Sequence, residues 1–138
     1  EIDAFEGLKK LKNLDISNNR IVLIDQFIWL HLENIETLSI MGNPMQIFNN
    51  NTFYGLKNVK YAYFTNSYLR EIWHSSFSSF SSLISKIIKF VDLKIELIHP
   101  NAFVGLSRVN IIYLSSNNLI NLQNFTFNGL ISLNELYL

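Results

Sequence analysis

Residues 109–130 read VNIIYLSSNNLINLQNFTFNGL, and the spacing of their apolar residues decides the fold. With Val109 counted as position 1, large apolar residues stand at positions 1, 4, 6, 11, 14, 19 and 22, and Asn117 stands at position 9. The same spacing begins again at Leu11 and at Ile35. A unit that returns at a fixed interval of about 20 to 50 residues is typical of a solenoid, in which each unit buries its apolar face against its neighbours.

An aromatic residue at position 19 marks every unit. Successive aromatics are 24, 24, 24, 26 and 24 residues apart, and each is followed three residues later by Leu or Phe. The repeat therefore covers the whole chain, 1–138, as a single domain of about five full repeats plus partial ends. The six aromatics are Phe5, Trp29, Phe53, Phe77, Phe103 and Phe127.

Positions 4 and 6 predict one short strand in each unit. Apolar residues there alternate with residues of other kinds, which is the two-residue period of a strand with one buried face. Stacked units then form a parallel sheet, with strands near 12–17, 36–41, 60–65, 87–91, 110–115 and 134–138. Asparagine at position 9 is expected to turn inward where the strand ends, because its amide can satisfy backbone groups that a turning chain leaves unpaired. Asn19, Asn43 and Asn117 therefore predict a ladder of inward amides.

Two units depart from the pattern. The third has Ser67 at position 9, where we expect a weaker ladder because serine has fewer hydrogen-bonding groups. The fourth contains two extra residues. Keeping charged Lys86 out of the core assigns the buried positions to Ile88 and Phe90 and places the extra residues near 83–87. Leu93 then occupies the asparagine position. A helix through 83–98 also fits the apolar spacing and remains the alternative.

This spacing resembles the leucine-rich repeat in its 24-residue form, which is common in extracellular animal proteins such as Toll-type receptors and Slit-type guidance proteins. The resemblance implies an α/β solenoid, a horseshoe whose concave face is a parallel sheet. Extracellular members of this family usually carry Cys-rich caps, but the chain contains no cysteine. Because a solenoid needs caps over its open core, we expect an uncapped fragment of a larger array whose exposed ends favour association.

Composition and charge argue against several functions. Eleven basic and eleven acidic residues leave no net charge, so the sequence predicts no nucleic-acid partner. No apolar run reaches the length of about 18 residues that a membrane span needs, although the parent protein could contain one. The three histidines lie outside the predicted strands, and the chain has no motif for catalysis or phosphate binding. We expect no enzyme activity, no cofactor and no metal site.

The candidate binding residues lie on the concave face. Residues at positions 3, 5 and 7 should point outward, and four of the six tyrosines fall at positions 3 and 5. Tyrosine is a rigid amphipathic side chain that suits protein recognition. The sequence therefore predicts a surface for a protein ligand or co-receptor, made of Tyr61, Tyr63, Lys89, Ile111, Tyr113 and Tyr137.

Two glycosylation sequons begin at Asn50 and Asn124. Both asparagines fall at repeat position 16, on the convex side and away from the tyrosines. This placement favours an extracellular or cell-surface ectodomain whose binding face carries no glycan. The predicted function is a protein-recognition module of a receptor, adhesion protein or secreted protein. A structural spacer or self-association segment and an intracellular scaffold are the alternatives.

Overall fold

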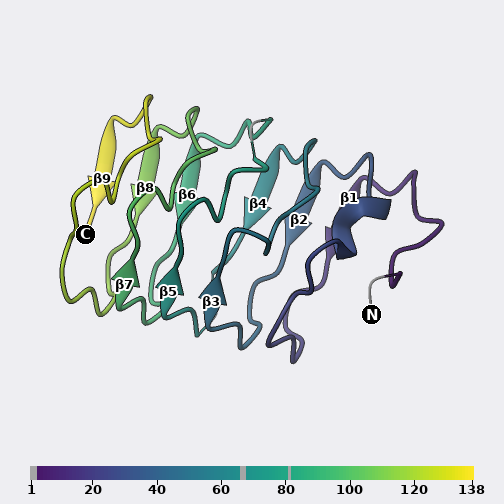
Figure 1. The fold of residues 1–138 in the computed structure, drawn as a ribbon, viewed down its shortest axis with the longest axis horizontal. Helices are drawn as coiled ribbons and strands as arrows, with labels where there is room; N and C mark the ends of the chain where they lie inside the picture. The colour runs from purple at the N-terminus through teal and green to yellow at the C-terminus, as the bar shows by residue number, and fades with distance from the viewer. Residues whose placement is uncertain (1–2, 66–67, 81) are drawn as a thin grey trace.

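The computed structural model describes residues 3–65, 68–80 and 82–138 as a solenoid of about five turns built on parallel strands (Figure 1). Six strands of three residues lie side by side along one row, and each lies inside one of the ranges that the sequence predicts. The middle residues Leu38, Ile88 and Ile112 are buried, as a strand with one buried face requires. The strands are β1 (Asn13–Asp15), β2 (Thr37–Ser39), β4 (Tyr61–Tyr63), β6 (Ile87–Lys89), β8 (Ile111–Tyr113) and β9 (Glu135–Tyr137).

A second row of strands runs along the other side of the turns (Figure 1). Its members β3 (Ile47–Phe48), β5 (Glu71–Ile72) and β7 (Leu97–Ile98) pair in parallel in that order. The sequence does not predict this row, because two residues with one inward side chain display no periodicity. Within the described ranges the only helix is a 3-10 segment, η1 (Ile28–His31), so turns make up most of the convex side.

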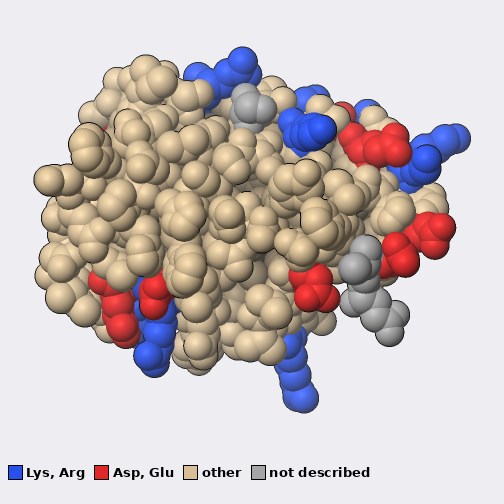
Figure 2. Space-filling model, viewed as in Figure 1, with Lys and Arg blue, Asp and Glu red and all other residues tan. Residues whose placement is uncertain are grey.

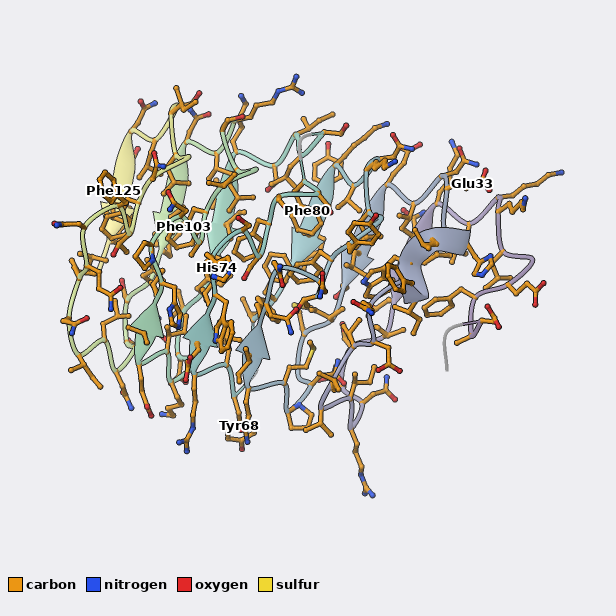
Figure 3. All side chains as sticks on the ribbon, in the orientation of Figure 1. Glu33, Tyr68, His74, Phe80, Phe103 and Phe125 are labelled. Carbon is orange, nitrogen blue, oxygen red and sulfur yellow. The ribbon has the colours of Figure 1, made fainter. Side chains whose placement is uncertain are left out.

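Phenylalanine rings fill the space between the two rows. Phe77 is completely buried, and its ring lies within 6.2 Å, between centroids, of rings from the units on both sides. Phe80 and Phe103, labelled in Figure 3, belong to the same core. The Trp29 indole also links two neighbouring units by a hydrogen bond, because its N–H donates to the Thr52 carbonyl at 2.7 Å. The position-19 aromatics from Phe53 to Phe127 therefore form a second core layer, in which successive ring centroids are 5.7 to 6.2 Å apart.

The fourth unit splits the first row of strands into two sheets, β1-β2-β4 and β6-β8-β9. In a regular unit the position-2 carbonyl accepts from the amides 24 and 25 residues later, as Lys86 does from Asn110 and Ile111. The Lys60 carbonyl keeps this spacing and accepts from Ile84 and Ser85, but β6 begins only at Ile87. The two extra residues thus lie at the start of the fourth unit, as predicted, and the segment 83–98 contains strands and no helix.

The predicted bonds between units are present at Asn43 and Asn117, but the prediction was wrong for Asn19, which is exposed and donates only to carbonyls of its own turn in the first unit. Buried Asn43 donates to the carbonyls of Ile40 and Ile16 at 2.9 and 3.0 Å, and its side-chain oxygen accepts from the amide of Ile21. Asn117 makes the equivalent bonds to the unit before it. Leu93 is buried and cannot form them. Ser67 lies outside the described residues.

We expect Asn43→Ala to lower the free energy of unfolding by about 1–3 kcal/mol, because it leaves buried backbone groups of two units without partners. Urea titration followed by circular dichroism measures the change. Asn19→Ala is the matched control, since exposed Asn19 bonds only within its own turn and its loss should cost less. Equal effects of the two substitutions would contradict the ladder.

Candidate functional site

The concave face displays two outward rows of side chains along the first row of strands. Parallel register aligns the position-5 residues, so that Lys89 lies opposite Tyr113 and Tyr113 opposite Tyr137. The same register places Ile87 beside Ile111 at position 3. The six residues that the sequence selects all lie on β4, β6, β8 and β9, which agrees with the strand period that predicted their outward direction.

Lys89, Tyr113 and Tyr137 form a compact cluster on β6, β8 and β9. The rings of Tyr113 and Tyr137 stack with centroids 4.7 Å apart and an interplanar angle of 6°. The Lys89 ammonium lies 5.8 Å from the centroid of the Tyr113 ring, within the range of a cation–π contact. Ile111 stands next to this cluster on β8. The stacking places aromatic side chains of two neighbouring strands in direct contact on the concave face.

Tyr61 and Tyr63 lie on β4, on the other side of the split in the sheet. Both are about half exposed. Between β4 and β6 the surface is hollowed by about 370 Å³. The structure thus divides the predicted surface into two groups of aromatic residues with a hollow between them. The hollow is lined by Ala62, Tyr63, Phe64, Thr65, Ser85, Ile87 and Lys89.

Acidic groups on this face occur at its two ends. The Tyr137 hydroxyl donates to the Glu135 carboxylate at 2.6 Å, and this hydrogen bond raises the pKa of the Tyr137 phenol. On β1, the hydroxyl and backbone N–H of Ser17 hydrogen-bond to Asp15 and lower the pKa of its carboxyl. Both carboxylates therefore have local hydrogen-bond partners, and they lie in the first and last units of the array.

Positive charge gathers along the edge at which the strands begin, which we call the strand-start edge. Seven of the eleven basic residues, but only two acidic ones, lie within four residues before a strand of the first row. Figure 2 shows blue side chains mainly along the upper edge of the molecule. The Glu36 carboxylate bonds to Lys60 at 2.7 Å and to Lys12 at 3.3 Å, which lowers its pKa. The basic residues are Lys9, Lys10, Lys12, Lys57, Lys60, Lys86 and Arg108.

The two sequon asparagines, Asn50 and Asn124, are exposed and lie off the concave rows. Their threonines are buried, and each hydroxyl accepts a hydrogen bond from the backbone three residues earlier. These threonines therefore have a structural role in the turn, whether or not the asparagines carry glycan. Glycosylation at Asn50 and Asn124 stays a prediction.

The structure also has a second exposed apolar surface, which the sequence does not predict. Val22, Leu23, Ile47 and Trp73 line a hollow of about 360 Å³ beside the second row of strands. Position 13 carries residues of mixed kinds along the array, so no repeat pattern indicated it. Near this surface Glu71 accepts from the Trp73 indole at 2.9 Å.

In the described part of the chain no three His, Cys, Asp or Glu side chains come together as metal ligands would. The same residues include no helix with the length and apolar character to cross a bilayer.

Comparison with known proteins agrees with the repeat architecture. A profile of the leucine rich repeat matches residues 1–45, and one of the BspA type leucine rich repeat region, in six copies, matches residues 24–138. Toll-like receptor 3 of Bos taurus is 30% identical over 137 residues, covering 90% of this chain and 15% of the receptor. Toll-like receptor 3 of Boselaphus tragocamelus is 27% identical over 147 residues, covering 98% of this chain and 16% of the receptor.

A crystal structure of a TLR13–ssRNA13 complex superposes with a TM-score of 0.84 at 29% identity, covering 96% of this chain and 18% of that one. The chain thus spans about one sixth of the length of the receptors it matches. The spacing, the parallel solenoid and these matches agree: the chain belongs to the leucine-rich repeat family and is similar to the repeats of Toll-like receptors.

Proposed function

We propose that this chain is a recognition segment of an extracellular or cell-surface protein, and that it binds a protein ligand or co-receptor on its concave face. The observation that carries the proposal is the aromatic surface in which Tyr61, Tyr63 and Tyr137 are about half exposed and the partly buried Tyr113 stacks on Tyr137. It acts by association and burial of apolar surface, without bond chemistry. Similarity to Toll-like receptors supports the extracellular or cell-surface setting.

Exposed tyrosines of this kind suit the centre of a protein interface. Aromatic side chains are enriched there because they bury a large area at a small cost in conformational entropy. A spacer would not need the row of tyrosines to face solvent. The split between β4 and β6 also gives the surface a concavity that a flat sheet lacks.

A selection from a displayed library of random peptides tests this proposal. The full chain is the target, and the affinity of the best synthetic peptide is measured for the variants. We expect Tyr63→Ala and Tyr113→Ala each to weaken binding by at least about fivefold, the effect of a residue at an interface centre. Tyr54→Ala is the matched control, because Tyr54 is 47% exposed and Tyr63 48%, but Tyr54 lies off the concave rows. Selected peptides that ignore Tyr63 and Tyr113 would refute the proposed face.

Recognition of single-stranded RNA is a second candidate, favoured by the strand-start edge. Lys57, Lys86 and Arg108 are exposed there and form no ion pair within the described part of the chain. The similar structure is a complex with single-stranded RNA, which weakens the exclusion of nucleic acid drawn from the neutral net charge. A chain of zero net charge can still bind phosphates where its cations are segregated.

Binding of a short labelled single-stranded RNA at several salt concentrations tests this candidate. Replacing Lys57, Lys86 and Arg108 together by Gln should weaken binding and reduce the salt slope by about 0.7 for each phosphate that the variant no longer neutralises. Arg20→Gln, at the opposite edge, is the control. An unchanged salt slope in the triple variant would exclude this edge as an RNA site.

A further inference from the structure

We propose that the hollow between β4 and β6 is a socket for an acidic peptide. The socket takes one aromatic or aliphatic side chain of the ligand, while the Lys89 ammonium pairs with the carboxylate of the neighbouring ligand residue. This inference rests on the proposed protein-binding function and names the chemistry of the ligand at its centre.

The socket exists because the two extra residues of the fourth unit separate β4 from β6. The amides of Ile84 and Ser85 donate to the Lys60 carbonyl at 3.0 and 2.9 Å. Because β6 begins two residues after Ser85, it is out of register with β4 and does not pair with it. The Ser85 hydroxyl then donates to the carbonyl of Ile87 at 2.7 Å, next to the gap. These bonds give the gap a defined wall, so the hollow is present before a ligand binds.

The walls of the socket are mainly apolar. Ala62 is buried at its base, and Tyr63 and Ile87 stand on opposite sides, 48% and 42% exposed. An exposed isoleucine beside a tyrosine gains free energy when an apolar group covers both. The volume of about 370 Å³ is near the lower limit for ligand pockets, which suits one large side chain rather than a whole small molecule.

The positive charge of Lys89 favours a ligand that carries a carboxylate. It is the only basic residue at positions 3, 5 and 7 of the array. Within the described residues it forms no ion pair, and its ammonium lies over the Tyr113 ring. The acidic groups Asp15 and Glu135 belong to the end units and already accept local hydrogen bonds. A carboxylate supplied by the ligand is therefore the complement that this face lacks.

Two matched dipeptides test the inference, acetyl-Phe-Asp-amide and acetyl-Phe-Asn-amide. Binding is measured by titration of the full chain, with the isoleucine methyl signals followed by NMR. We expect the Asp peptide to bind about three- to fivefold more tightly than the Asn peptide, the effect of a solvent-exposed ion pair. The signal of Ile87 should shift with both peptides. Lys89→Met should abolish the preference for Asp, and Ile87→Ser should weaken both peptides.

Matched controls separate the socket from general effects. Ile47→Ser removes an isoleucine of similar exposure, 40%, from the second row of strands, and Lys10→Met removes an exposed lysine just before the first full unit. Neither should change peptide affinity. Three results would each overturn the socket: equal affinity for the two peptides, a shift that maps away from Ile87, or no binding at about 10 mM peptide. At that concentration even a weak site of Kd about 1 mM would be mostly filled. The library-selected peptide distinguishes that failure from failure of the proposed function, because it would still depend on Tyr113.

Discussion

Replacing Phe77 with alanine is expected to lower the free energy of unfolding by about 3–5 kcal/mol, the range for a phenylalanine deleted from a packed core. Phe77 has no exposed surface. Its ring contacts phenylalanines from the unit before, from its own unit and from the unit after, so the cavity would open in the middle of the array. The rings within 6.2 Å of it are those of Phe48, Phe53, Phe64, Phe80, Phe90 and Phe103.

Phe125→Ala provides the control for this prediction. Phe125 is 71% exposed, so the same change of side chain removes little buried surface and should cost under about 1 kcal/mol. Urea unfolding followed by circular dichroism compares the two variants in one experiment. Comparable losses for Phe77 and Phe125 would mean that the phenylalanine layer is not the main stabilising core.

Gly105→Ala is expected to destabilise the chain by about 2–5 kcal/mol, from backbone strain and overpacking together. Gly105 has φ +103°, a conformation that L-residues rarely adopt. An added Cβ would overlap the carbonyl oxygen of Phe77, which is backbone of the preceding unit and cannot rotate away. Gly105 therefore permits the close approach of its own turn to the turn at Phe77, and Gly129 does the same beside Phe103 and Val104.

Gly7→Ala separates the two causes. Gly7 also has positive φ, +82°, but a Cβ there would meet no atom within 4 Å. Its substitution should show the strain alone, about 1–2 kcal/mol. The excess loss in Gly105→Ala, measured by the same unfolding experiment, reports the contact between turns. If both variants lost the same stability, the close approach at Phe77 would be irrelevant.

The strands were predictable because the polarity of each single residue indicates whether its side chain can be buried. Leu38, Ile88 and Ile112 must be buried, and only a strand places them inward between outward neighbours. The same logic excluded Lys86 from the core and located the extra residues of the fourth unit. The gap between β4 and β6 was not predictable from the sequence, because it depends on whether the amide of Ser85 or a later amide bonds to the Lys60 carbonyl.

The sequence predicted which way the side chains of the candidate site point, but not how far apart they lie. Strand period shows that Tyr63, Tyr113 and Tyr137 point outward, but it gives no distance between residues on neighbouring strands. Tyr113 and Tyr137 stack because β8 and β9 are paired in register, whereas Tyr63 stands apart because β4 and β6 are not. The second row of strands gave no periodic signal at all, since each of its strands has only two residues.

The split in the sheet is one-sided. On the concave side β4 and β6 are unpaired, but on the other side the ladder continues across the same units, with Glu71 opposite Leu97 and Ile72 opposite Ile98. The paired strands β5 and β7 should therefore hold the two units together more stiffly than the concave side, where the strands are unpaired and the amides of Ile84 and Ser85 bond across to Lys60. Bending of this array should concentrate at the fourth unit, with the paired strands β5 and β7 acting as the hinge. A side chain seated in the gap would act as a wedge that sets the opening angle, and because the two halves extend several units away, a small change there would move the ends of the array by a larger amount.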